Sequence, residues 1–131
     1  EEYAYALDEI VLPVYSQFKP EFVICCSGFD AYFKDTYAKL YLTTKGYYNL
    51  VSKIRKNVGP GRMCILMEGG YNKDNGILAH TIIDALLGKE RTFEEEIDSL
   101  SYSVTRAGKP RKILEEKLKE LKAQLSEFYT F

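Results

Sequence analysis

Apolar positions divide the first ninety residues into helical and strand-like segments. Residues 2–18, 42–57 and 74–88 carry apolar side chains at spacings of three and four, the pattern of amphipathic helices. Pro13 predicts that the first helix bends or restarts there, because proline disrupts a helix interior. The N-cap of the second helix is predicted to be Thr43 or the residue after it.

Two continuous apolar runs lie between these helices, FVICC at residues 22–26 and CILM at residues 64–67. Such short runs predict strands that are covered on both faces. Strand, helix, strand and helix in this order predict an α/β fold, in which a right-handed crossover joins two parallel strands. Two strands make a small sheet, so this βαβ unit is expected to have further strands beside it.

After residue 90 the strand-like apolar runs end and the sequence becomes helical in pattern. This predicts a division into residues 1–90 and a C-terminal helical extension at 91–131. Thr92 and Glu95 resemble a capping box, and a long helix over 112–128 is expected after a break at AGKP. Its apolar stripe predicts either docking on the domain or a contact between copies. The stripe consists of Leu114, Leu118, Leu121, Leu125 and Phe128.

Composition narrows the classes of partner. The chain has 131 residues, with 18 basic and 19 acidic side chains mixed along its length, so no nucleic-acid or membrane-binding surface is expected. Its three cysteines lie in apolar runs, and neither a signal peptide nor a spanning segment is visible, which favours a cytoplasmic location. The chain opens with EEYAYALDE, without Met, so a fragment of a longer protein is expected.

Candidate chemistry follows the two predicted strands. Ligands of parallel α/β sheets bind beyond the carboxyl ends of the strands, where this chain has Asp30 and, in EGGY, Tyr71. The aspartate is either a metal ligand or a cap of the following turn, and the tyrosine is either a hydrogen-bond donor or a packing residue. Asp35, five residues further on, is either close to the site or a solvated loop charge.

Several motifs in order resemble the zinc-dependent histone deacetylase family, especially prokaryotic members related to acetoin-utilisation proteins and acetylpolyamine amidohydrolases. They are SGFDA at 27–31, LYLT at 40–43 with GY at 46–47, and EGGYN at 68–72. The resemblance covers about residues 3–88. It implies the βαβ portion of an arginase/deacetylase-like parallel sheet with flanking helices.

The resemblance also implies roles for single residues. Asp30 matches an aspartate that is one of three protein ligands of the catalytic zinc, and Tyr71 matches a tyrosine that donates a hydrogen bond to the acetyl carbonyl. Gly69 and Gly70 match the wall of the acyl-lysine tunnel. Tyr37 falls at the rim, where the family usually has Leu or Met, and an aromatic ring there would narrow the entrance or stack on a ligand.

The histidines that the family mechanism requires are absent from this chain, whose one histidine, His80, is expected on a helix face. We therefore expect the C-terminal part of a zinc-dependent amidohydrolase, inactive by itself and completed by the upstream part of the same polypeptide. Its substrate would be an acetyl-lysine or an acetylated small molecule. The alternative is a non-catalytic α/β scaffold that assembles as a homo-oligomer through its C-terminal helix.

Overall fold

The computed structural model describes residues 2–38, 40–94 and 108–131. They form two compact units, one of Glu1–Lys19 with Glu94–Phe131 and one of Pro20–Phe93. The boundary after residue 90 expected from the sequence stays a prediction. No helix among the described residues combines the length and apolar composition needed to cross a bilayer.

The first unit contains the N-terminal helix in three stretches: α1 at Glu2–Ala6, a π-helical stretch η1 at Leu7–Val11, and α2 at Leu12–Phe18. The predicted helix and its restart are confirmed. Pro13 lies near the start of α2, directly after η1, so the hydrogen-bond pattern of the helix changes where proline supplies no backbone N–H.

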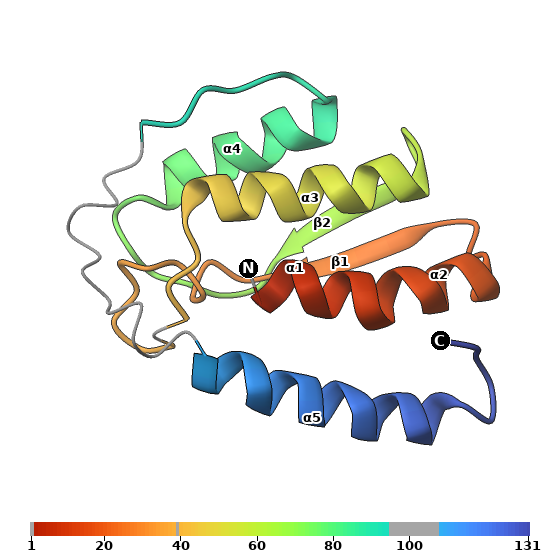
Figure 1. Ribbon diagram of the computed structural model, residues 1–131. Coiled ribbons are helices and arrows are strands. Elements are labelled where there is room, and N and C mark those ends of the chain that lie inside the picture. Colours follow the sequence, from red (N-terminus) through yellow and green to blue (C-terminus); the bar gives the residue numbers. More distant parts are fainter. Residues whose placement is uncertain (1, 39, 95–107) are drawn as a thin grey trace. The chain divides into compact units, whose positions relative to one another are not determined.

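The second helical segment of this unit is α5, at Gly108–Leu125 (Figure 1). The predicted break at AGKP is wrong in its last three residues, because the helix already begins at Gly108. Pro110 lies in the first turn, where proline is tolerated. The predicted capping box includes Glu95, which lies outside the described residues.

Contacts between α5 and the N-terminal helix hold the first unit together. Lys122 pairs with Glu9 at 2.6 Å, and the guanidinium of Arg111 lies 3.4 Å from the ring centre of Tyr5. In the apolar stripe Leu118 is only 8% exposed, whereas Phe128 is 75% exposed. The middle of the stripe is therefore buried. A contact between copies of the chain stays a prediction.

The second unit is the predicted βαβ arrangement. Strand β1 spans Val23–Ser27, α3 spans Thr44–Val58, β2 spans Met63–Met67 and α4 spans Asn75–Leu87. The strands are parallel, with Cys25 opposite Ile65. Of the two predicted N-caps, Thr43 is the observed one, and its hydroxyl accepts from Gly46 N at 3.0 Å.

Helices α3 and α4 lie side by side over the sheet (Figure 1). Their apolar sides and the loop after β1 form one core, against which Ile65 of β2 packs. The buried residues of this core are Phe29, Ala31, Tyr32, Tyr47, Val51, Leu78, Ile82 and Ala85.

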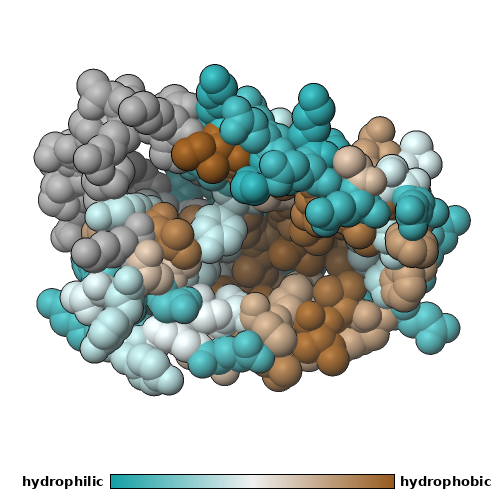
Figure 2. Space-filling view, turned by 90° about the horizontal axis from the view of Figure 1, so that it is seen from below, coloured by the Kyte–Doolittle hydropathy of each residue, from teal (hydrophilic) through white to brown (hydrophobic). Residues whose placement is uncertain are grey.

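Within this unit, helices cover one face of the strands, whereas the sequence predicts cover on both. Residues along β1 alternate between half-buried and exposed, with Ile24 61% exposed, and Leu66 of β2 is 50% exposed. Among the described residues of this unit, both helices pack on the face that carries Ile65, and neither covers the face that carries Ile24 and Leu66. Apolar surface, in brown, is visible on the side of the molecule shown in Figure 2.

Candidate active site

The loops that follow the two strands meet at their backbones. Phe29 N donates a hydrogen bond to Gly69 O at 2.7 Å. Gly70 has a φ of +89° and lies so close to Phe29 and Asp30 that a built Cβ would stand 2.5 Å from Asp30 N. Only glycine fits this approach, since any side chain would collide with the facing main chain. The motifs SGFDA and EGGYN are thus joined into one structure.

Asp30 presents its carboxylate at this junction. The side chain is exposed, and its Oδ1 lies 2.6 Å from a Cβ built on Gly28, while its Oδ2 lies 3.7 Å from one built on Gly69. Glycines on both sides therefore leave room for the carboxylate. The turn before it is tied to the core, because Tyr47 donates its hydroxyl proton to Gly28 O at 3.1 Å.

Tyr71 and Tyr37 project beside a shallow depression of about 250 Å³. Their side chains are 89% and 85% exposed. The other residues that line the depression are Lys34, Asp35, Thr36, Asn72, Lys73 and Asp74. The structure therefore places the predicted donor and the predicted rim residue on one surface, with Asp30 on the neighbouring turn.

The two carboxylates that line the depression already have hydrogen-bond or ion-pair partners. Asp35 is 8% exposed, and its Oδ1 accepts from Tyr37 N at 2.8 Å and from Ala38 N at 3.2 Å. It shapes the turn that carries Tyr37, so the interpretation as a solvated loop charge is wrong. Asp74 pairs with Lys34 at 2.9 Å.

Beneath these residues, Tyr32 is 3% exposed, and its hydroxyl lies 3.5 Å from Asp74 Oδ2. Burial raises the pKa of Tyr32, and the carboxylate of Asp74 adds to the rise, while the nearby cation of Lys34 opposes it. The phenol therefore stays protonated, since a phenolate would lose hydration without gaining a sufficient partner. Tyr32 acts here as a packing and hydrogen-bonding residue.

His80 lies on α4 away from this surface. Its ring is 66% exposed, lies 3.7 Å from Asp84 and is 3.1 Å from Arg91. The expectation of a helix-face residue is confirmed. Sequence reasoning missed Asn75, the first residue of α4, whose Nδ2 donates to Gly70 O at 2.6 Å. Only its position three residues after EGGYN could have drawn attention to it.

The described residues do not form a zinc site by themselves. Catalytic zinc is usually held by three protein ligands, and no group of three or more His, Cys, Asp or Glu side chains in the described part of the chain could hold a metal ion. Asp30 supplies one carboxylate, and Gly28 and Gly69 leave the space around it open.

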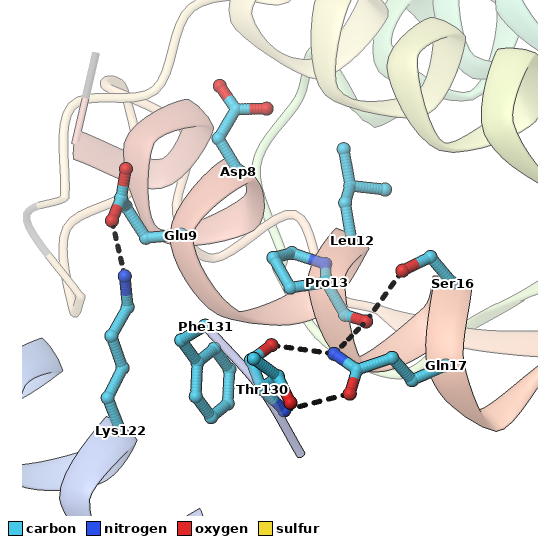
Figure 3. Close-up of a pocket in the computed structure, with 9 residues that line it drawn as sticks. All are labelled: Asp8, Glu9, Leu12, Pro13, Ser16, Gln17, Lys122, Thr130 and Phe131. Carbon is cyan, nitrogen blue, oxygen red and sulfur yellow. Dashed lines mark hydrogen bonds and ion pairs between the residues drawn. The ribbon is translucent and has the colours of Figure 1, made fainter. Parts of the chain in front are cut away.

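A second cavity, of about 530 Å³, lies within the first unit (Figure 3). The side chain of Gln17 in α2 forms two hydrogen bonds with the main chain of Thr130, donating to its carbonyl at 2.7 Å and accepting from its N–H at 2.8 Å. Glu9 and Lys122 form another side of the cavity through their ion pair. These contacts fasten the C-terminal segment to the N-terminal helix and involve none of the predicted site residues.

Comparison with known proteins identifies the family. The histone deacetylase domain matches residues 1–85, so the chain belongs to the histone deacetylase family. It is 35% identical to histone deacetylase 14, chloroplastic, of Arabidopsis thaliana over 101 residues, which cover 72% of this chain and 23% of that protein. It is also 35% identical to a probable deacetylase of Archaeoglobus fulgidus over 94 residues, 67% of this chain and 26% of that protein.

Solved structures agree on the fold. The crystal structure of the HDA15 HD domain superposes with a TM-score of 0.63 at 31% identity, covering 89% of this chain and 35% of that one. The structure of the histone deacetylase Clr3 gives a TM-score of 0.62 at 32% identity, covering 70% of this chain and 16% of that one. The predicted deacetylase-like α/β fold is confirmed. Assignment to a prokaryotic branch stays a prediction, since the relatives include plant, fungal and archaeal proteins.

The chain spans about a quarter or less of the curated relatives described above. For histone deacetylase HDA1 of Saccharomyces cerevisiae the share is 10%, at 38% identity over 73 residues.

Proposed function

We propose that these residues are the C-terminal portion of a zinc-dependent deacetylase that hydrolyses the amide bond of an acetyl-lysine or another acetylated amine. Asp30 is one protein ligand of the zinc, and the upstream part of the same polypeptide supplies the others. Membership of the histone deacetylase family supports this function. The isolated chain is then inactive and holds zinc weakly, because one carboxylate is too few ligands. A cytoplasmic location belongs to the same proposal.

The observation that carries the proposal is the junction of the two loops. Gly70 lies against the backbone of Phe29 and Asp30, and Phe29 N donates to Gly69 O at 2.7 Å. A carboxylate that binds metal and a phenol that binds substrate must keep a fixed separation, since a displacement of about 1 Å can cost a hundredfold in rate. The shared junction provides such a fixed frame for Asp30 and Tyr71.

Tyr71 donates its hydroxyl proton in a hydrogen bond to the substrate carbonyl oxygen as negative charge develops there. Its 89% exposure leaves the hydroxyl available to a ligand. In the complete site, Asp30 and the upstream ligands would hold a zinc ion, which would supply the nucleophile by lowering the pKa of a bound water. Gly69 and Gly70 form part of the wall along the acyl chain, and Tyr37 lines the entrance.

The test compares Tyr71→Phe with Tyr48→Phe in the intact zinc-loaded protein. Removing one oxyanion donor costs about 10²–10³ in kcat, so Tyr71→Phe is expected to fall in that range on an acetyl-lysine peptide. Tyr48 is the control, because its hydroxyl donates to Lys89 O away from the depression. An unchanged kcat for Tyr71→Phe, or no hydrolysis of acetylated peptide or polyamine by the intact protein, would refute the proposal.

A further inference from the structure

Asn75 contacts both chain neighbours of Tyr71. Its side-chain Nδ2 donates to Gly70 O at 2.6 Å, and its backbone N–H donates to Asn72 O at 3.3 Å. We propose that Asn75 is a positioning residue that fixes the direction in which Tyr71 points. The inference rests on the proposed function, in which the Tyr71 hydroxyl meets the substrate carbonyl.

Tyr71 depends on such a constraint because packing against the described residues does not hold it. Its side chain is 89% exposed, so the direction of the ring is set mainly by the backbone on either side. Two glycines precede it, and glycine has more backbone freedom than any other residue. The bond from Asn75 to Gly70 O removes part of this freedom at the residue directly before Tyr71.

The other end of the constraint is rigid. Asn75 begins α4, whose Leu78, Ile82 and Ala85 are buried in the core of the second unit. Asn72 completes the turn, since its Oδ1 accepts from Asp74 N at 2.8 Å. Asn75 therefore links the EGGYN motif to a packed helix through the bond to Gly70 O.

The orientation of the Asn75 amide is determined by the Gly70 bond. A carbonyl oxygen only accepts, so the group that faces Gly70 O at 2.6 Å must be the NH₂. In this orientation Asn75 Oδ1 is buried with no partner among the described residues, which costs free energy. The bond to Gly70 O therefore forms even though the other polar atom of the same amide has no partner.

Asn75→Asp in the intact zinc-loaded protein removes the donor and preserves the shape of the side chain. Aspartate is favourable in the first turn of a helix, so α4 is expected to stay folded. We expect kcat to fall by about tenfold to a hundredfold, as for other misplaced catalytic groups, with KM nearly unchanged. Amide hydrogen exchange at residues 70–72 is expected to accelerate, which is a readout independent of activity. Asn49→Asp, exposed on α3, is the matched control.

A double mutant separates positioning from general damage. In a Tyr71→Phe background, Asn75→Asp is expected to change kcat by less than about twofold, because residues that act through one group are not additive. Asn75→Ala, which introduces no charge, should behave in the same way. The positioning role alone would be overturned if the effects of the Tyr71 and Asn75 substitutions on kcat were fully additive. It would also be overturned if both Asn75 variants had normal kcat and normal hydrogen exchange while Tyr71→Phe was impaired. An unimpaired Tyr71→Phe would overturn the proposed function itself.

Discussion

Gly70 carries the most specific structural requirement of the site, and Gly70→Ala tests it. An added Cβ would stand 2.5 Å from Asp30 N and 2.6 Å from Phe29 Cα, where real Cβ atoms essentially never come within 3.0 Å. The two loops would have to separate by more than about 0.5 Å, because Phe29 C stands closer still. Phe29 cannot yield easily, because its side chain is fully buried and packs edge-on against Tyr47.

Two costs add at this position. Holding alanine at a φ of +89° stores about 1–3 kcal/mol of backbone strain. Forcing a methyl group into a packed junction costs about 1–3 kcal/mol more. We therefore expect Gly70→Ala to reduce the free energy of unfolding by about 3 kcal/mol, which lowers the urea midpoint by about 1.5 M at a slope of about 2 kcal/mol/M.

Two other glycines separate these costs in urea titrations followed by circular dichroism. Gly61 has a φ of +74° with no heavy atom within 4 Å of a built Cβ, so Gly61→Ala reports the strain alone. Gly76, within α4, has open space and no positive φ, so Gly76→Ala should stabilise by up to about 1 kcal/mol. The reasoning is refuted if Gly70→Ala is no more destabilising than Gly61→Ala, within the roughly 0.5 kcal/mol typical of neutral substitutions.

Three further predictions concern other contacts. The pKa of the Cys26 thiol is raised because it donates to the Glu68 carboxylate, whose negative charge also disfavours the thiolate. Glu68→Gln should therefore raise the thiolate fraction and speed alkylation of Cys26 at pH 8. An unchanged alkylation rate, followed by mass spectrometry, would contradict this. Asp35→Ala should lose about 1–2 kcal/mol in urea unfolding, since two backbone N–H groups lose their acceptor, whereas Asp35→Asn should lose less. Gln17→Ala should accelerate hydrogen exchange at Thr130 N, and protection that persists would show that the bond to Gln17 is unimportant.

The sequence predicts the elements of the second unit well because their signals are local. Apolar runs of strand length, helical spacing and an N-cap threonine each act within a few residues, and β1, β2 and α3 form where these signals occur. The parallel pairing follows from the order of the elements. The motifs SGFDA and EGGYN also indicate that two strand ends meet.

The spacing of residues in the sequence does not predict the burial or the hydrogen-bond partners of each side chain. Asp35 looks like a loop charge in the sequence, and its burial depends on two backbone N–H groups that turn toward it. Ile24 lies in an apolar run but is exposed, because both helices of its unit pack on the other face. Asn75 attracts no attention until α4 brings its amide to Gly70 O.

The metal content of Asp30→Asn in the intact protein tests the central claim most directly. Asp30→Asn and Asp35→Asn each replace one carboxylate close to the depression, but only Asp30 is proposed as a ligand. After dialysis against zinc-free buffer, the account predicts that Asp35→Asn retains zinc close to the wild-type ratio and that Asp30→Asn loses most of it, together with deacetylation. Equal zinc retention and equal rates in Asp30→Asn and wild type would contradict the account.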